Sequence, residues 1–390
     1  MLPFTAVTAC EPTDHRASPF PKADESRCTR FRFRPRDADE KDAAARAEVC
    51  LRPGGGTPAR ANAPTLQRMD ATGQPLTGAA YLDSLRDGRE IWLDGECVRD
   101  VVNHPAFRNA ARSIARLYDT LHDPQQRDVL TTVDRQGHRT MRFFAPAYSA
   151  ADLLASRDAI AQWARTSFGW LGRTPDYKAS FMASLGADPG FYQPFEANAA
   201  RWYADYARQC LFLNHVLVDP PVDRNKPLED TRNVYLHVEE EVDGGVYISG
   251  AKMMGTGSAL THGTFVAQNS GSAARLVEGR TEDFALVAFI PMGTPGQKLV
   301  CRSSYERKSG APFDNPLASR FDENDAVLVW EHAFVPWENV LVYRDIDKAR
   351  AFYAASGFLP RFVLQAVTRQ AVKLDFLCGL FLKAIASNGT

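Results

Sequence analysis

The period of the hydrophobic pattern changes twice along this chain, and this feature constrains the fold most strongly. From Leu76 to about Gln209, apolar residues recur mostly at the three- and four-residue spacing of amphipathic helices. From about Asn233 they alternate with polar residues, which is typical of strands that bury one face. The helical spacing returns after Asp345. Helices, then antiparallel strands, then helices predict an α+β architecture with segregated domains.

The expected elements have definite bounds. Asp243-Gly244-Gly245 separates the first two strands, and we expect it to supply the positive φ of a tight hairpin turn. The last helix is apolar on nearly every side, so we expect it inside a helical bundle. We predict helices over 81–88, 109–121, 149–168, 194–213 and 361–386, and strands over 234–238, 246–249, 264–268, 284–290, 298–302, 326–330 and 340–343.

The same pattern predicts four regions. Residues 1–68 hold eight of the 24 prolines, an Arg-rich stretch over 30–36 and no apolar periodicity, so we expect a disordered extension. Orderly patterning begins after Met69, and we expect translation to start properly there. We predict a helical domain over 69–210, a β domain over 211–344 and a truncated helical domain over 345–390.

Composition and charge exclude several classes of protein. With 46 Lys and Arg against 47 Asp and Glu, bulk positive charge cannot drive nucleic-acid binding. No apolar run is long enough to predict a membrane-spanning helix, and no secretory signal is evident. Seven scattered cysteines without a CxxC pair favour free thiols in the cytoplasm, and eight dispersed histidines do not indicate a metal site. Rossmann, P-loop, HExxH and GxSxG motifs are absent from the sequence.

The segment Gly172–Tyr177 carries residue types suited to binding an anion or a phenol. Arg173 and Tyr177 flank a rigid Thr-Pro turn, where a permanent cation and a phenol can converge on one ligand. The alternative is an ordinary turn between helices, in which Asp176 caps the helix that starts near Tyr177.

Two further segments have a structural and a functional interpretation. His215 is expected near the C-terminal end of the helix over 194–213, where it either exchanges a proton with a substrate hydroxyl or, protonated, stabilises the helix end. Gly250–His262 directly follows a predicted strand. It offers small residues and hydroxyls such as that of Thr256 to a planar ligand, or it is a plain glycine-rich turn.

Several blocks in colinear order resemble one family, the oxygenase component of 4-hydroxyphenylacetate 3-monooxygenase. The resemblance runs from about residue 76 to the end of the chain. It is carried by Thr77–Gly88, His104–Arg112, Gly172–Tyr177, Asn214-His215, Gly250–Lys252, Ser319–Asp325 and Val335–Val340. This family is similar in fold to acyl-CoA dehydrogenases, with an N-terminal helical domain, a middle antiparallel β domain and a C-terminal helical bundle. Only the start of that bundle is expected here.

The resemblance also implies a reaction. Reduced FAD (FADH2), made by a separate NAD(P)H-dependent flavin reductase, and O2 would hydroxylate a phenol such as 4-hydroxyphenylacetate ortho to its hydroxyl group. It implies a homotetramer built with the C-terminal stretch that this sequence lacks. Two alternatives stay open: an acyl-CoA dehydrogenase-like flavoprotein and an inactive truncated paralogue.

The resemblance assigns roles to particular residues. It implies that Arg173, Tyr177 and His215 are catalytic and hold the phenolic oxygen, with His215 also beside the flavin. Gln268 and Asn269 would close the substrate pocket. The implied flavin contacts are Pro221, Val222, Asp223, Arg224 and Thr256.

Overall fold

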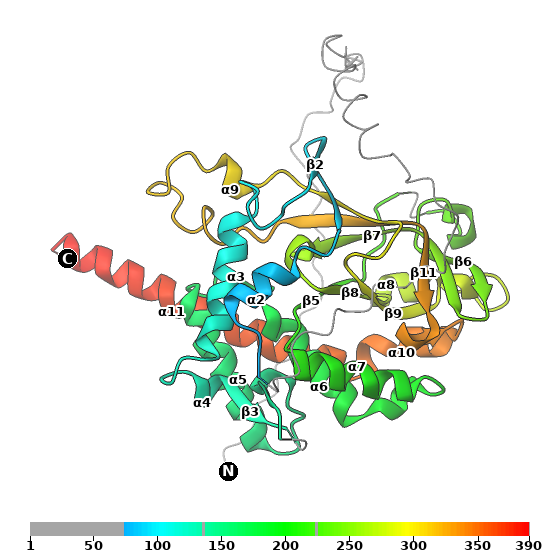
Figure 1. Cartoon of the computed structure of the whole chain (residues 1–390), viewed down its shortest axis with the longest axis horizontal. Coiled ribbons are helices and arrows are strands. Elements are labelled where there is room, and N and C mark those ends of the chain that lie inside the picture. The colour runs from blue at the N-terminus through cyan, green and yellow to red at the C-terminus, as the bar shows by residue number, and fades with distance from the viewer. Residues whose placement is uncertain (1–73, 135–136, 223–224, 390) are drawn as a thin grey trace, which may run out of the picture. The chain divides into compact units, whose positions relative to one another are not determined.

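The computed structural model describes residues 74–134, 137–222 and 225–389. The predicted extension over 1–68 and the expected start at Met69 lie outside the described residues. The predicted helix–strand–helix order is confirmed, and the elements follow that order in Figure 1. The domain bounds stay predictions.

The first part of the described chain is mainly helical. The helix predicted over 109–121 is confirmed one residue earlier, and those over 149–168 and 194–213 are confirmed with shorter ends, whereas the first helix begins and ends earlier than predicted. The helices are α2 (Gly78–Ser84), α3 (Arg108–Thr120), α4 (Arg127–Leu130), α5 (Ala150–Thr166), α6 (Pro175–Ala187) and α7 (Glu196–Gln209). Four strands here were not predicted, because segments this short carry no periodic signal: β1 (Glu90–Leu93), β2 (Glu96–Val98), β3 (Thr131–Val133) and β4 (Arg139–Met141).

The middle of the chain builds two larger sheets. One has six strands in the order β2-β1-β10-β11-β7-β6, and the other has four in the order β12-β9-β8-β5. Most neighbours are antiparallel as predicted, but β1 with β10 and β5 with β8 are parallel pairs. The strands are β5 (Leu213–Val216), β6 (His237–Val242), β7 (Gly245–Thr256), β8 (Gly263–Val266), β9 (Leu286–Pro291), β10 (Gln297–Cys301), β11 (Asp325–Pro336) and β12 (Val340–Tyr343).

The hairpin between β6 and β7 has the predicted position but not the predicted backbone. None of Asp243, Gly244 and Gly245 has a positive φ, so that part of the prediction is wrong. Steric crowding by the neighbouring strand, and not the turn, explains why position 245 is a glycine. A Cβ atom on Gly245 would lie 2.2 Å from the carbonyl oxygen of Val335 on β11, far inside contact distance.

Two helices close the chain, α10 (Ile346–Ala355) and α11 (Phe358–Ser387). Asp345 caps α10 by accepting the N–H group of Lys348 at 2.8 Å. The first half of α11 packs against α5 and α6. Its second half extends away from the other elements in Figure 1 and exposes Leu380, Phe381, Leu382 and Ile385 to between 49% and 68%. The helix is therefore confirmed, but among the described residues its C-terminal half lies outside any bundle.

One continuous apolar core joins the helices and both larger sheets. It reaches the inner face of α6 through Phe181, whose ring lies 5.0 Å from Phe265 of β8 and 5.0 Å from Phe358 of α11. Phe181 of helix α6 thus packs against both strand β8 and the start of α11.

Candidate functional site

The start of α6 positions Arg173 and Tyr177. Pro175 occupies the first turn, where a missing N–H group costs no helical hydrogen bond. The helix therefore begins before Tyr177 and Thr174 holds the N-cap position, which corrects the prediction that Asp176 is the cap. Asp176 is buried instead. Its carboxyl group accepts hydrogen bonds from Thr174 Oγ1 and, at 3.1 Å, from Nε2 of Gln365 on α11.

His215 lies in strand β5, and the predicted place at a helix end is wrong. Helix α7 ends at Gln209, and Cys210, in the left-handed region with φ 52°, turns the chain into a buried apolar strand. The interpretation of a protonated histidine that stabilises a helix end therefore fails. The His215 ring instead lies 5.5 Å from the ring of Tyr177 and 5.6 Å from that of Phe358, measured between centroids.

Arg173, Tyr177 and His215 line a single cavity of about 250 Å³. The guanidinium carbon of Arg173 lies 4.3 Å from the ring centroid of Tyr177. Thr256 and Asn269 line the same cavity. The rest of the wall is mainly apolar or aromatic and comes from β5, the two residues after it, β7, α10 and α11: Leu213, Asn214, Leu217, Val218, Met253, Met254, Tyr353, Phe358 and Phe362.

Electrostatics keep His215 neutral. Burial lowers its pKa well below the usual range, and the nearby cations Lys178 and Arg173 act in the same direction. Its buried Nδ1 atom has no hydrogen-bond partner among the described residues. Burial also raises the pKa of Tyr177, against the opposing charge of Arg173, so Tyr177 stays a protonated phenol. The cavity thus holds a permanent cation, a hydroxyl donor and an unprotonated imidazole.

Two polar residues at this site carried no role in the sequence analysis. Asn214 lines the cavity and is buried, and neither of its amide atoms has a partner among the described residues. Lys178 is buried behind the wall, with its ammonium nitrogen 4.2 Å from the Tyr177 ring and 4.6 Å from the Phe358 ring. Asn214 directly precedes His215 in one of the blocks that carry the family resemblance, and this position was the only sign of its role in the sequence. Nothing in the sequence shows that Lys178 is buried.

Thr256 approaches the cavity from the end of β7. Gly250–Lys252 belongs to this same strand, so the expected glycine-rich turn after a strand is not present. The hydroxyl group of Thr256 donates to Oδ1 of Asp325 at 2.5 Å. Met254, which also lines the cavity, has a left-handed φ of 65° beside a register irregularity between β7 and β11.

The two residues implied to close the pocket differ in position. Asn269 lines the cavity, while its amide accepts the N–H group of Ser272 at 2.9 Å and donates to the Leu217 carbonyl at 3.1 Å. Gln268 is buried outside the lining. Its amide accepts from Lys252 Nζ at 2.7 Å and donates to the carbonyl of Phe284 at 2.6 Å. The predicted substrate contact of Gln268 gains no support from this geometry.

The predicted flavin contacts after β5 are placed only in part. Pro221 and Val222 are exposed and lie outside the lining of the first cavity, and Asp223 and Arg224 lie outside the described residues. A second cavity of about 280 Å³ shares Val218 and Asn269 with the first, so the two hollows adjoin. Its lining also includes Asp219, Tyr235, Gly271, Ser272 and the cation Arg275, which the sequence analysis did not single out.

In residues 74–134, 137–222 and 225–389, no group of three or more His, Cys, Asp or Glu side chains is placed to hold a metal ion. Across the same ranges, every helix falls short of the length or the hydrophobicity that a membrane span requires.

Comparison with known proteins identifies relatives of this chain. It is 53% identical over 315 residues to the pyoverdin chromophore biosynthetic protein PvcC of Pseudomonas aeruginosa, covering 81% of this chain and 62% of that protein. It is 53% identical over 328 residues to the 4-hydroxyphenylacetate 3-monooxygenase oxygenase component of the same organism, covering 83% and 62%. The chain therefore spans about 62% of the length of these relatives.

A solved structure shares the fold. The oxygenase component of 4-hydroxyphenylacetate 3-monooxygenase, crystallised with FAD and 4-hydroxyphenylacetate, superposes with a TM-score of 0.72 at 31% identity, covering 78% of this chain and 63% of that one. The expected α+β, acyl-CoA dehydrogenase-like fold is confirmed. Family models described as the N-terminal and C-terminal parts of 4-hydroxyphenylacetate 3-hydroxylase match residues 77–342 and 349–390. This chain belongs to the 4-hydroxyphenylacetate 3-hydroxylase family.

Proposed function

We propose that this chain is the oxygenase component of a two-component flavin monooxygenase, and that it hydroxylates a phenol ortho to its hydroxyl group with FADH2 and O2. The observation that carries the proposal is the cavity shared by Arg173, Tyr177 and His215. A cation, a phenol and a neutral imidazole around one hollow suit a ligand that changes between phenol and phenolate.

Each of these three side chains has a separate role toward the phenol. The neutral imidazole of His215 accepts a hydrogen bond from the substrate hydroxyl and takes its proton as the ring reacts. The Arg173 guanidinium stabilises the resulting phenolate, and Tyr177 donates a second hydrogen bond to its oxygen. More negative charge on that oxygen makes the ortho carbon more nucleophilic. The apolar wall around them keeps bulk water away.

The cavity residues fit a flavin. FADH2 supplies the oxygen-activating chemistry when it is bound. The unpaired amide of Asn214 offers a donor and an acceptor together, which the polar edge of a flavin ring can satisfy. Thr256 stands on the same wall, and Arg275 in the adjoining cavity provides a cation for a phosphate group. These residues would hold the cofactor beside the phenol.

The identity of the phenol is a separate question. A 4-hydroxyphenylacetate-like compound is the proposed substrate, because the solved structure with the same fold was crystallised with 4-hydroxyphenylacetate. However, two relatives at the same 53% identity are named for different pathways. Family membership therefore defines the class of substrate and not the compound.

The remaining parts of the system follow from the same proposal. A separate NAD(P)H-dependent flavin reductase would deliver FADH2, and a homotetramer is the assembly expected for the family. A cytoplasmic location is proposed from the scattered cysteines. The acyl-CoA dehydrogenase alternative is not favoured, since among the described residues no carboxylate that could act as the catalytic base of such an enzyme lines the cavity.

Anaerobic titration of the purified chain with FADH2 tests the proposal, followed by addition of oxygen and 4-hydroxyphenylacetate. We expect saturable changes in the flavin spectrum at micromolar concentrations and formation of the catechol product. Flavin binding without hydroxylation would support the inactive-paralogue alternative. No spectral change at high micromolar flavin would contradict the proposed activity and leave the fold assignment unaffected.

A further inference from the structure

One short segment, Asp322–Asp325, touches both walls of the cavity. On the substrate side, Oε1 of Glu323 accepts the backbone N–H groups of Gly172, at 2.7 Å, and of Arg173. These two N–H groups immediately precede the start of α6. The Glu323 carboxyl group therefore fixes the backbone from which the Arg173 side chain departs.

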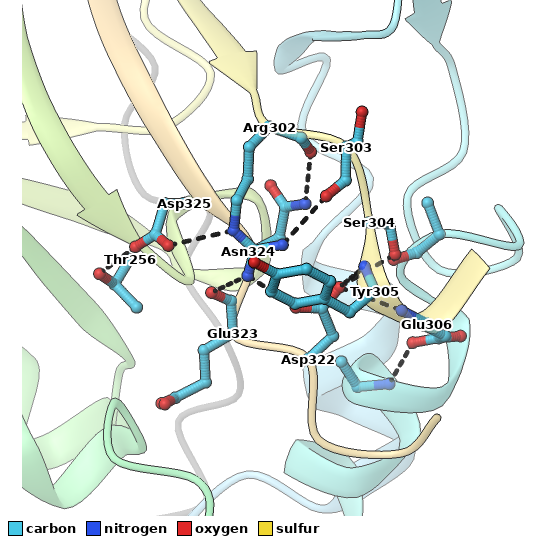
Figure 2. A network of polar contacts seen from close by, with 12 residues as sticks. Thr256, Arg302, Ser303, Ser304, Tyr305, Glu306, Asp322, Glu323, Asn324 and Asp325 are labelled. Carbon is cyan, nitrogen blue, oxygen red and sulfur yellow. Dashed lines mark hydrogen bonds and ion pairs between the residues drawn. The ribbon is translucent and has the colours of Figure 1, made fainter. Parts of the chain in front are cut away.

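The next two residues reach the opposite wall. The carbonyl oxygen of Asn324 accepts the N–H group of Gly257 at 2.9 Å. Oδ1 of Asp325 accepts the hydroxyl group of Thr256 at 2.5 Å, a contact visible in Figure 2. The three successive residues 323–325 thus connect the backbone just before α6 with the end of β7.

The segment is itself held from outside the cavity. Arg302, just beyond β10, donates to Oδ2 of Asp325 at 3.2 Å, to Oδ1 of Asp322 at 2.7 Å and to the carbonyl of Glu323 at 3.0 Å. The other oxygen of Asp322 accepts the N–H groups at the start of α9 (Tyr305–Lys308), as Figure 2 shows. These contacts anchor both ends of the segment before any ligand arrives.

We propose that Glu323 and Asp325 are positioning residues that set the spacing between Arg173 and Thr256. The inference rests on the proposed function, in which Arg173 faces the phenol and Thr256 faces the flavin. Reaction between two bound partners is sensitive to their separation, so a displacement of about 1 Å can lower the rate roughly 100-fold. Neither residue lines the cavity, so each acts through the group it holds.

The surroundings of Glu323 also shift the pKa of its carboxyl group. Burial raises the pKa of its carboxyl group, while the two N–H groups and the charges of Arg173 and Arg369 act against that shift. An amide at this position would keep the shape of the side chain but weaken both hydrogen bonds, since an ionised acceptor binds N–H groups more strongly than a neutral one.

Hydrogen exchange on Glu323→Gln tests the positioning role without any ligand. Glu306→Gln is the matched control, because Glu306 also accepts two backbone N–H groups, those of Asn109 and Ala110, at 2.9 and 3.1 Å. We expect Glu323→Gln to raise amide exchange over residues 170–177, and Asp325→Asn to raise it over 254–258. Glu306→Gln should raise exchange at 108–112 only. Unchanged exchange over 170–177 in a folded Glu323→Gln protein would overturn the proposal.

Binding of 4-hydroxyphenylacetate, measured by calorimetry, gives a second readout. Glu323→Gln should weaken binding by roughly tenfold, because two charge-assisted hydrogen bonds behind Arg173 are lost. Glu306→Gln should stay within about twofold of the parent, since Glu306 supports α3 away from the cavity. If Glu323→Gln and Glu306→Gln weaken binding of the phenol equally, Glu323 has only a general structural role and the proposal is wrong. If the parent itself fails to bind the phenol, the proposed function fails, while the exchange experiment still decides the positioning role. Should Glu323→Gln not fold, Glu323→Asp serves in both measurements.

Discussion

At the scale of single residues, desolvation controls the chemistry of the cavity. Arg173 stays charged, because a guanidinium group does not lose its proton in proteins. His215 and Lys178 respond to the same surroundings in the opposite way, since burial and neighbouring positive charge lower both pKa values well below their usual ranges. The site therefore concentrates its permanent positive charge on one side chain and leaves a neutral base beside it.

The role of His215 leads to a kinetic prediction. His215→Ala should lower phenol hydroxylation by about 10²–10⁴-fold, the usual contribution of general acid–base catalysis, while largely sparing FADH2 binding. Product formation and anaerobic flavin titration check the two parts separately. His332→Ala is a suitable control, because His332 is an exposed histidine that stacks on Tyr247 away from the cavity. Equal hydroxylation in the His215 variant and the parent would remove this residue from the mechanism.

Lys178 leads to a prediction about stability. Its buried side-chain nitrogen has no hydrogen-bond partner among the described residues and contacts aromatic rings. Burying such a group costs free energy, so Lys178→Met should raise the free energy of unfolding by about 1–3 kcal/mol. Urea unfolding measures this change. A clear loss of stability would show that the contacts of Lys178 with the two aromatic rings outweigh the cost of burying its nitrogen.

At the scale of elements, close backbone approach matters as much as hydrophobic pattern. The β6–β7 hairpin was predicted from Asp243-Gly244-Gly245, yet its second glycine is required by the neighbouring strand β11 and not by the turn. Strand β5 was missed because it follows the apolar residues 210–212 directly, and in the sequence this stretch continues the helical pattern of α7. The helix ends because Cys210 takes a left-handed conformation, and no local signal predicts that conformation.

The hairpin offers a matched pair of substitutions. Gly245→Ala should lower the free energy of unfolding by about 1–3 kcal/mol, because the new methyl group would press on the β11 backbone. Gly244→Ala should change it far less, since a Cβ there meets only the Phe334 ring, at an ordinary 3.5 Å. Thermal and urea unfolding of both variants measure the difference. Similar losses would mean that backbone entropy, and not the clash, explains the effect.

At the scale of the whole molecule, buried ionisable groups couple stability to pH with opposite signs. Burial lowers the pKa of His262 to about 3, whereas burial raises the pKa of Asp176 to about 6. His262 therefore contributes stability that is present above its ordinary pKa of 6.5 and is lost as pH falls toward 3. Asp176 contributes in the other direction, since ionising it between pH 3.8 and about 6 destabilises the folded state.

This linkage predicts the pH dependence of unfolding. As pH falls from 6.5 to 4, protonation linked to His262 should lower the stability of the parent by up to about 3 kcal/mol, and Asp176 should offset about 2–3 kcal/mol of this loss. The loss should be smaller in His262→Gln and larger in Asp176→Asn, which removes the opposing contribution. Urea unfolding at a series of pH values provides the test. Identical slopes in all three proteins would show that these groups are not buried as described.

The exposed part of α11 predicts self-association. Leu380, Phe381, Leu382 and Ile385 are between 49% and 68% exposed, and each would gain about 1.5–3 kcal/mol if fully buried. Phe381→Lys with Leu382→Lys should shift sedimentation toward the monomer while circular dichroism stays unchanged. An unchanged oligomeric state in the double variant would place the association surface elsewhere.

The amino-acid sequence by itself determined the order of helical and β regions, the approximate positions of five helices and the candidates Arg173, Tyr177 and His215. Period and turn chemistry are local properties, and colinear motifs carry the family resemblance. Only the tertiary structure decided that β5 brings His215 beside Tyr177. It also decided that the Gln268 amide accepts a hydrogen bond from Lys252, and that Glu323 accepts a hydrogen bond from the backbone of Gly172, next to Arg173. These outcomes depend on contacts between residues up to 151 positions apart. Burial and charge are properties of the packed surroundings, which no local pattern contains.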